Sequence, residues 1–475
     1  MKFLYINLIF LSIITAIQAN PFSDIYILQT TDVHSAIFSV PGWLREASLI
    51  KNEIKKLGKD KVLLIDCGDS LQGSFSAMVT QGKVGVLMLN ELEYDIWVPG
   101  NHDFDFGLKI FLDRAEKVKA DCLMANSTLL AKNFPPWKIY KKNGLKIAVI
   151  GMTFPWTYTM IWGKTIRSTG LIDISNALDS IMEDVMLSKP DIIVLATHRW
   201  LYSPKRIGGL SFSKIHEKYP QIDLFLGGHV HQSVEGELTG DGGYAVVAGA
   251  HAESLAEIHI KYDQYNKKIA NIESALIKVD KTIPEDKSIA EKLTNLRRFI
   301  DQERNKPVAF LKDLLSMQKI EEILGKEVCK KTGTDFSLIS LPAYIKFLPE
   351  GLINREDVFN IEPYEDQIIT MTLSLKELKS LFKALFSMKK YQFTFCANLK
   401  HTFSFCRKKD EIKKIFSDLP DKKYKLALFS FFAAGAENRL PLLGKIASES
   451  SGKAVSTGIK VRDILESVLK KSFPN

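Results

Sequence analysis

The sequence predicts an α/β fold: a layered first domain with buried strands, followed by a smaller α+β domain. Short apolar runs alternate with amphipathic stretches from residue 24 to about residue 280, and this alternation is typical of a layered α/β domain. A polar, helix-favouring stretch then precedes a second start of the pattern near Val308. A chain of 475 residues is also too long for one compact core. We therefore expect two domains.

Several apolar runs in the first domain have the length and β-branched content of strands that are buried on both faces. These runs are Ile25–Leu28, Val62–Ile65, Ile96–Val98, Ala148–Ile150, Ile192–Leu195 and Ile222–Leu226. Apolar residues at helical spacing predict helices over 44–57 and 174–186. Asn143-Gly144 lies between two further runs and predicts a hairpin. Because residues 244–263 also have strand character, we expect the sheet to be mixed or doubled.

The N-terminal residues have the features of a cleavable signal peptide. Lys2 precedes a short apolar stretch, and the small residue Ala19 is suited to cleavage. The apolar stretch is too short for a comfortable membrane span, and Asn7 interrupts it. An uncleaved anchor is the weaker alternative. We expect residues 1–19 to be a signal peptide and the protein to be exported, either periplasmic or secreted, with no stable membrane span after cleavage.

The remaining predicted bounds are 20–283 for the first domain, 284–307 for a linker helix and 308–475 for the second domain. Leu293, Leu296 and Ile300 have helical spacing within the linker. The hydrophobic fraction of 46% and charged fraction of 25% exclude a disordered chain and a polytopic membrane protein. The net charge of +9 suits an anionic substrate or surface, but because the lysines are scattered it indicates solubility first. We expect no nucleic-acid polymer as a partner.

The cysteines give one candidate pair. Cys67 and Cys122 lie in predicted buried strands and are expected to act as small apolar residues. Cys396 and Cys406 flank a short polar loop. In an oxidising compartment this pair is the candidate disulfide.

Metal-binding side chains follow the ends of several predicted strands. The segments are Asp32-Val33-His34, Gly68-Asp69, Gly100-Asn101-His102-Asp103, Thr197-His198 and Gly228-His229-Val230-His231. In α/β sheets ligands bind at the carboxyl edge of the strands, so distant segments can converge there. Histidines and carboxylates two positions apart point to the same side of an extended chain. This donor set suits zinc, manganese, iron or cobalt better than calcium or magnesium. The sequence therefore predicts two adjacent divalent metal ions.

The ordered set Asp-x-His, Gly-Asp, Gly-Asn-His-Asp, His and Gly-His-x-His resembles the calcineurin-like metallophosphoesterases. The string from Gly100 to Gly107 is similar to the 5′-nucleotidase branch, which includes UDP-sugar hydrolases and 2′,3′-cyclic nucleotide phosphodiesterases. The resemblance implies a catalytic sandwich of two mixed sheets flanked by helices, followed by a substrate-specificity domain. It also implies a small-molecule phosphate ester as substrate, hydrolysed by a metal-activated water.

The resemblance also implies a role for each site residue. The ligands of one metal would be Asp32, His34, Asp69 and His231. The ligands of the other metal would be Asp69, Asn101, His198 and His229, with Asp69 as the bridge. His102 would face the substrate phosphate, oriented by Asp105, and stabilise negative charge or protonate the leaving oxygen.

The other polar residues near these segments are interpreted differently. Asp103 is expected to form local hydrogen bonds. His251 follows another strand end and remains unassigned. The remaining histidines are expected to be structural or solvent-facing; they are His216, His259 and His401.

The second domain departs from the family pattern. Residues 351–364 and 431–437 resemble its motifs, but 340–345 lack the arginine with which the family contacts a nucleotide. Phe393 and Phe395 fall near the place where the family stacks a nucleobase, although alternating aromatic residues are more often core. Three explanations remain open. Another cation replaces that arginine, or the substrate is not a standard nucleoside monophosphate, or the alignment with the family is displaced and the arginine comes from elsewhere.

Three functions remain open at this stage. The first is an exported phosphohydrolase that acts on nucleotides or related phosphate esters. The second keeps the metal site but acts on a non-nucleotide substrate, as a sulfate–thiol hydrolase does. The third is a non-catalytic secreted binding protein. The retained ligand set and the pair His102 and Asp105 favour the first function, because a binding protein needs neither. The sequence leaves the oligomeric state open.

Overall fold

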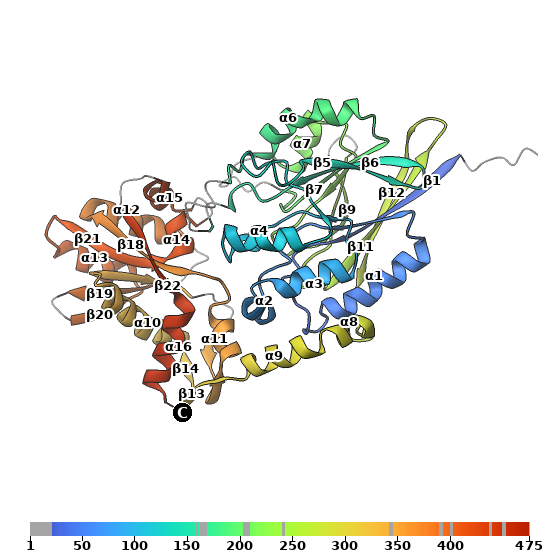
Figure 1. Ribbon diagram of the computed structural model, residues 1–475. Coiled ribbons are helices and arrows are strands. Elements are labelled where there is room, and N and C mark those ends of the chain that lie inside the picture. Colours follow the sequence, from blue (N-terminus) through green and yellow to red (C-terminus); the bar gives the residue numbers. More distant parts are fainter. Residues whose placement is uncertain are drawn as a thin grey trace, which may run out of the picture.

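The chain folds into two lobes that are joined by a helical segment, as Figure 1 shows. This computed structural model describes residues 21–157, 160–161, 169–202, 210–239, 243–341, 345–388, 393–399, 402–436, 439–448 and 453–474. The predicted signal peptide, residues 1–19, lies outside the described residues. Within the described ranges, none of the helices has both the length and the apolar character needed to span a bilayer.

One mixed sheet of the first lobe carries the N-terminal strand near its middle. Its strand order is β12-β11-β1-β2-β3-β4. The bounds are β1 (Phe22–Thr30), β2 (Val62–Asp66), β3 (Ile96–Trp97), β4 (Asp121–Cys122), β11 (Ser254–Asp263) and β12 (Lys268–Lys278). Strands β1 to β4 are parallel, whereas β11 runs antiparallel to both β1 and β12. The carboxyl ends of the first three strands therefore share one edge.

The second sheet of this lobe is also six-stranded and mixed, with the order β5-β6-β7-β8-β10-β9. Its bounds are β5 (Trp137–Lys142), β6 (Leu145–Met152), β7 (Ile192–Thr197), β8 (Leu224–Leu226), β9 (Val234–Thr239) and β10 (Gly243–Val247). The predicted hairpin joins β5 and β6. Asn143 and Gly144 have φ values of 46° and 81°, as a tight turn of the I′ type requires. The prediction of a hairpin is confirmed.

The two sheets pack face to face, and helices cover their outer faces. Alternate residues of β1, such as Ile25 and Ile27, share an apolar cluster with residues of the second sheet, such as Val149 and Val194. Leu28, on the other face of β1, packs with the helices instead. The helices of this lobe are α1 (Trp43–Leu57), α2 (Phe75–Thr80), α3 (Lys83–Glu91), α4 (Leu108–Lys117), α6 (Ile174–Leu187) and α7 (Phe212–Lys218). The predicted sandwich of two mixed sheets flanked by helices is confirmed.

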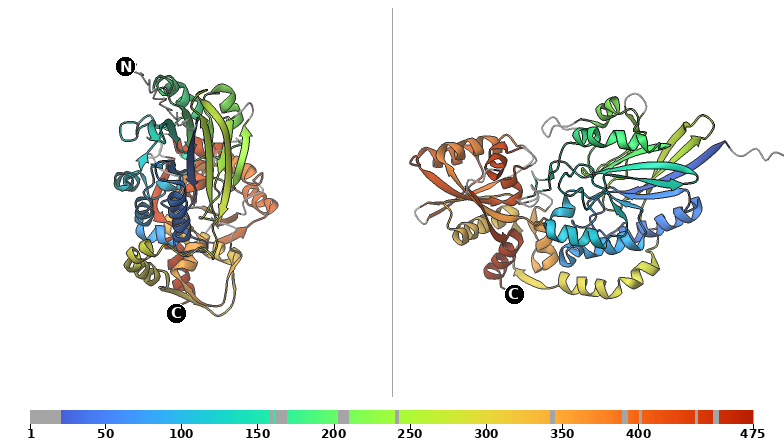
Figure 2. Two further views of the ribbon diagram at one scale, coloured as in Figure 1. Left: turned by 90° about the vertical axis from the view of Figure 1, so that its right-hand side faces the viewer. Right: turned by 45° about the horizontal axis from the view of Figure 1, so that its top comes forward.

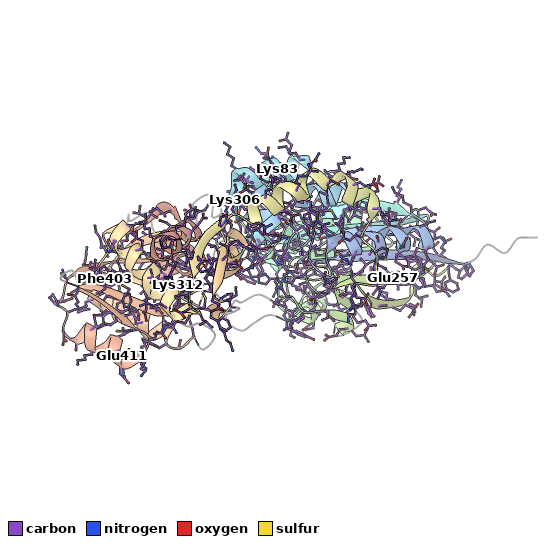
Figure 3. All side chains as sticks on the ribbon, turned by 90° about the horizontal axis from the view of Figure 1, so that it is seen from below. Lys83, Glu257, Lys306, Lys312, Phe403 and Glu411 are labelled. Carbon is purple, nitrogen blue, oxygen red and sulfur yellow. The ribbon has the colours of Figure 1, made fainter. Side chains whose placement is uncertain are left out.

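The link between the lobes consists of two consecutive helices, α8 (Lys287–Lys292) and α9 (Thr294–Arg304). Figure 2 shows both helices running along the first lobe before the chain enters the second. In Figure 3, Lys306 lies just after α9, whereas Phe403 and Glu411 mark the far part of the second lobe. Phe75 of the first lobe packs edge to face on Phe359 of the second, at 5.8 Å between ring centroids.

The second lobe is built around a six-stranded sheet with the order β20-β19-β15-β21-β18-β22. Its strands are β15 (Phe336–Ile339), β18 (Gln367–Ser374), β19 (Thr394–Leu399), β20 (Thr402–Cys406), β21 (Lys423–Phe429) and β22 (Ala454–Lys460). Two small sheets pair β13 (Pro307–Leu311) with β17 (Gly351–Asn354), and β14 (Leu315–Ser316) with β16 (Phe347–Leu348). The helices are α10 (Met317–Thr332), α11 (Arg355–Ile361), α12 (Leu375–Leu385), α13 (Lys409–Ser417), α14 (Ser430–Ala434), α15 (Pro441–Ser448) and α16 (Val461–Ser472). The domain bounds 20–283 and 308–475 stay predictions.

The predicted Cys396–Cys406 disulfide is wrong. In the register of β19 and β20, Cys396 pairs with Phe405, whereas Phe395 pairs with Cys406. Because successive side chains alternate between the two faces of a sheet, the two thiols point to opposite faces. All five cysteines are free. Cys396 instead lies beside Cys329 of α10.

Candidate metal centre

The predicted site residues converge at the carboxyl edges of both sheets of the first lobe. Asp32 and His34 follow β1, Asp69 follows β2, and His198 follows β7. The remaining residues follow β3 or β8; they are Asn101, His102, His229 and His231. Each parallel strand ends at the same edge, which is why segments far apart in sequence reach one point.

One candidate metal-binding group combines Asp32, His34 and His231, whose ligand atoms lie within 4.8 Å of one another. The Nε2 atoms of His34 and His231 are 2.9 Å apart. His231 Nε2 is 3.5 Å from Asp32 Oδ1. These nitrogen and oxygen atoms surround a point where a divalent cation can be held.

A second candidate group shares Asp32 and adds Asp69 and His198. His198 Nε2 lies 3.0 Å from Asp69 Oδ2 and 3.9 Å from Asp32 Oδ1. Beside this group, His229 Nδ1 lies 2.8 Å from Asn101 Oδ1. Asp69 also reaches toward the first group, because its Oδ2 is 4.0 Å from His34 Nε2.

Several buried polar side-chain atoms at this point lack a hydrogen-bond partner. Asp69 Oδ2, His198 Nε2 and Asn101 Nδ2 are buried, and in the part of the chain that the structure describes none of them forms a hydrogen bond. Buried polar atoms are normally satisfied, so a set of unsatisfied ones at one point is suited to hold an ion or a water molecule. The carboxylate and imidazole donors here fit divalent cations such as zinc or manganese.

Hydrogen bonds behind the histidines fix which ring nitrogen faces the centre. His34 Nδ1 donates to the carbonyl of Gln72 at 2.7 Å, and His198 Nδ1 donates to the carbonyl of Cys67 at 2.7 Å. Each Nε2 atom therefore faces the centre, which is how outer hydrogen bonds orient metal-binding histidines.

Asp103 holds the turn that carries Asp69. Its two carboxylate oxygens accept hydrogen bonds from four backbone N–H groups, those of Asp69 (2.9 Å), Ser70 (3.0 Å), Leu71 (2.8 Å) and Gly100 (2.7 Å). These bonds tie the turn after β2 to the turn after β3. The prediction that Asp103 acts by local hydrogen bonding is confirmed.

Backbone strain is concentrated at this site. Asp32, His34, Asp69, His229 and His231 all adopt left-handed φ values between 52° and 84°. Residues with a side chain reach this region at a cost of about 1–3 kcal/mol each, and such strain is retained chiefly at functional sites. The backbone of the turn after β3 also lies very close to the Asp69 side chain, because a Cβ atom added at Gly100 would be 2.2 Å from Asp69 Oδ1.

The protonation states suit metal binding. Burial lowers the pKa of both His34 and His229 well below the ordinary value for histidine. Burial alone would raise the pKa of Asp69, but the neighbouring imidazoles of His198 and His102 outweigh it and hold that pKa well below its usual range. Burial raises the pKa of Asp32 to about 6. Neutral imidazoles and an ionised carboxylate are the forms that bind metal. His198 is the exception, because the charges of Asp69 and Asp32 outweigh burial and raise its pKa to about 9, so a metal ion would have to displace its proton.

His102 differs from the other histidines of the site. It lies in a short 3₁₀ helix (His102–Phe104) and belongs to neither candidate metal group. Its Nδ1 donates to Asp105 Oδ2 at 2.7 Å, and its side chain is 19% exposed. Burial lowers the pKa of His102, but the carboxylates of Asp105 and Asp69 outweigh it and raise the pKa to about 10. His102 is thus a protonated, accessible imidazole beside the candidate metal groups.

Two residues that the sequence did not assign also contact the site. The ring of Tyr364, from the second lobe, stacks on the ring of His102 at 5.6 Å between centroids and 19° between planes. The ring of His251 lies 5.3 Å from that of His34 and 5.1 Å from that of His231. A strand end preceded His251 in the sequence, and Tyr364 ends the segment 351–364 that resembles a family motif, but the sequence gave neither residue a role.

The other predicted residues lie away from the candidate metal groups. His216 is buried against Phe225, and His259 contacts Asp24 and Glu273. His401 lies outside the described residues. Phe395 is fully buried and stacks on Phe336 in the core of the second lobe. Phe393 packs edge to face on Phe432.

A protein-family model matches most of the first lobe. Residues 25–233 match the family model of the calcineurin-like phosphoesterases, and this range contains every residue of both candidate metal groups. Residues 25–233 are a calcineurin-like phosphoesterase domain. Phosphoesterases of this family use divalent metals, and the donor set described above fits that requirement.

Relatives of this phosphoesterase span most of the chain. A 5′-nucleotidase-related protein of Glossina morsitans morsitans is 24% identical, with 78% of this chain and 74% of the relative covered. Protein UshA of Escherichia coli is 22% identical, with 95% and 91% covered. The structure of a 5′-nucleotidase precursor from Thermus thermophilus superimposes with a TM-score of 0.70 at 16% identity, covering 95% and 97%. The calcineurin-like phosphoesterase domain makes this chain a phosphate-ester hydrolase.

Proposed function

We propose that the chain is an exported phosphohydrolase with two metal ions, which hydrolyses nucleotides or related small phosphate esters. The observation that carries this proposal is the position of Asp69 between two sets of imidazoles. Its Oδ2 approaches both His198 and His34, and among the described residues that oxygen accepts no hydrogen bond. Both oxygens of Asp32, by contrast, already accept the backbone N–H of His229. Asp69 is therefore better suited than Asp32 to bridge the two metal ions.

The proposed ligand sets follow from the two candidate groups. One divalent ion would be held by Asp32, His34, Asp69 and His231. The other would be held by Asp69, Asn101, His198 and His229. The donor types favour zinc, manganese, iron or cobalt. Such a pair of ions supplies a nucleophile at neutral pH and positive charge for the phosphoryl oxygens.

His102 supplies the proton for the departing alkoxide. Because its Nδ1 is engaged by Asp105, the proton available to substrate is on Nε2. The charge of Asp105 and its hydrogen bond to Nδ1 favour the protonated form of the ring. A protonated imidazole next to the metal groups both stabilises negative charge on phosphate and serves as a general acid.

The substrate class is supported by the relatives rather than by the second lobe. The names 5′-nucleotidase and 2′,3′-cyclic-nucleotide 2′-phosphodiesterase/3′-nucleotidase occur among relatives of this chain. The segment that replaces the family arginine contains Pro342–Tyr344, which lie outside the described residues. Export is supported by the composition of residues 1–19.

A hydrolysis panel tests this proposal. The mature chain would be loaded with Mn²⁺, Co²⁺ or Zn²⁺ and offered p-nitrophenyl phosphate, bis(p-nitrophenyl) phosphate, AMP, cyclic nucleotides and UDP-glucose. We expect turnover of at least one ester that falls to background in Asp69→Ala and is unchanged in Asp179→Asn, which alters an exposed carboxylate of α6. A folded, metal-loaded chain that hydrolyses none of them would contradict the proposal and favour a non-phosphate substrate or a binding protein.

A further inference from the structure

Arg199 carries a buried positive charge that has no hydrogen-bonded counter-ion among the described residues. It directly follows His198 after β7 and is 3% exposed. Both terminal nitrogens of its guanidinium, Nη1 and Nη2, are buried and form no hydrogen bond with any residue that the structure describes. Arginine stays protonated in proteins, and a buried charge is normally paired. The guanidinium is therefore suited to hold an anion that is not part of the chain.

The neighbours of Arg199 do not satisfy these donors. Its guanidinium carbon lies 5.6 Å from the centre of the Trp156 ring, and the face of a ring attracts a cation without replacing the hydrogen bonds in the guanidinium plane. Burial lowers the pKa of Arg199, and the charge of Asp173 opposes that shift. Asp173 is engaged elsewhere, because its Oδ1 accepts the backbone N–H of Ser175 at 2.9 Å.

The N-terminus of α6 lies at the same edge of the second sheet. The chain leaves β6 at Met152, and α6 returns it to the parallel strand β7, so the helix begins at the carboxyl ends of these strands. Asp173 is the N-cap of this 14-residue helix, and the N–H of Ala177 bonds to the Asp173 carbonyl at 3.1 Å. The N–H groups before Ala177 have no partner within the helix, and their partial positive charge favours an anion.

Arg199 extends from the face of the second sheet that α6 covers. Leu195 of β7 packs on that face with Ile174, the first residue of α6. Because alternate residues share a face, Arg199, four positions later, continues it. At the ends of β6 and β7, the hydroxyls of Thr153 and Thr197 are also buried and lack a hydrogen bond in the described part of the chain. This edge therefore combines the donors with which proteins bind oxyanions.

The edge adjoins the candidate metal centre through one turn. The carbonyl of Arg199 accepts the N–H of Gly228 at 2.9 Å, which ties this segment to the turn that carries His229. The ring of Phe154 contacts Trp156 at 5.6 Å and stacks on His229 at 4.0 Å between centroids. An anion held by Arg199 is thus separated from His229 by these two rings.

We propose that Arg199 and the N-terminus of α6 bind an oxyanion, which is either a second phosphate or carboxylate group of the substrate or a free phosphate ion. The carrying observation is the buried guanidinium whose terminal nitrogens are unpartnered among the described residues. Two parallel N–H···O bonds hold the oxyanion, a geometry that arginine offers and lysine does not. The site goes beyond the proposed hydrolysis, because it needs no metal ion.

Phosphate titration of four proteins separates this site from the metal centre. In calorimetry the metal-loaded full chain should bind two phosphate ions, and Asp69→Ala should bind one. Arg199→Gln should bind phosphate at the metal centre alone, and the double variant should bind none. Affinity at the Arg199 site should fall by about tenfold or more in Arg199→Gln, as for a lost charge-assisted hydrogen bond, and by less in Arg199→Lys, which keeps the charge. Arg298→Gln, at an exposed arginine of α9, is the matched control.

Thermal unfolding and a pair of substrates give two further measurements. Phosphate should raise the melting temperature of Asp69→Ala, because a ligand of the folded state stabilises it, but not that of the double variant. If the substrate supplies the anion, Arg199→Gln raises KM for adenosine 3′,5′-bisphosphate and not for AMP; if free phosphate is the ligand, neither KM changes.

The inference would be overturned if Asp69→Ala bound no phosphate, or if Arg199→Gln left that binding unaltered. A wild-type chain that binds phosphate at Arg199 but hydrolyses no ester would contradict the proposed function alone.

Discussion

Removal of the His102 side chain separates metal binding from proton transfer. His102 belongs to neither candidate metal group, so His102→Ala should keep its metal ions. The variant loses an imidazole whose Nδ1 is 2.7 Å from Asp105 and whose pKa is raised to about 10. General acids contribute about 10²–10⁴-fold to a rate, which corresponds to about 2.7–5.4 kcal/mol at about 1.36 kcal/mol per tenfold. We expect kcat to fall within that range.

The assay for this prediction compares leaving groups at fixed metal loading. The kcat for an alkyl or nucleoside phosphate should fall by the full factor, whereas the kcat for p-nitrophenyl phosphate should fall by a smaller factor. Elemental analysis of the same samples gives the metal content. A variant that turns over at the wild-type rate, or one that loses metal in proportion to activity, would refute the role given to His102.

The stability of the metal-free protein should depend on the same residue in a defined pH window. The pKa of His102 rises from the ordinary value of 6.5 to about 10 in the folded protein, because Asp105 and Asp69 outweigh burial. Protonated His102 therefore favours the folded state fully below pH 6.5, and this contribution disappears as the pH rises through about 10. Urea unfolding should show His102→Ala to be destabilised at about pH 6 and progressively less so toward pH 10. A pH-independent difference would contradict the direction of the shift.

The remaining predictions concern the turns and the thiols. Gly100→Ala should abolish metal binding measured by calorimetry, because the new Cβ atom would lie 2.2 Å from Asp69 Oδ1, whereas Gly444→Ala, with its nearest atom at 3.4 Å, should bind metal normally. Asp103→Ala should lower the free energy of unfolding by about 3 kcal/mol or more, since four buried backbone N–H groups lose their acceptor; a loss under 1 kcal/mol would contradict this. Cys406→Ser should leave the melting temperature unchanged with and without reductant, and a reductant-dependent difference would show that Cys406 is disulfide-bonded.

The strands and the candidate ligands were predictable because their signals are local. Apolar runs such as Val62–Ile65 and Ile192–Leu195 indicate strands that are buried on both faces. Because neighbouring strands are parallel, the residues that follow them lie at the same edge of the sheet. Asp69 and His198 could therefore be brought together from their positions after strands alone. The same reasoning gave the hairpin at Asn143, where the turn type demands particular residues.

The failures have equally specific causes. Cys396 and Cys406 flank a plausible hairpin, but the register pairs Cys396 with Phe405, and a shift of one residue places a side chain on the opposite face. Sequence spacing cannot supply that register. Tyr364 was missed because its contact with His102 depends on how two lobes dock, which no local pattern encodes.

The central claim, two metal ions joined by one carboxylate, is tested most directly by metal stoichiometry. The wild-type chain and Asp69→Ala would be stripped, reloaded with Mn²⁺ or Zn²⁺ and measured by elemental analysis. The structure predicts two ions per chain for the wild type and none for Asp69→Ala, because Asp69 Oδ2 faces both His198 and His34. One ion in the wild type, or one retained by Asp69→Ala, would contradict the account.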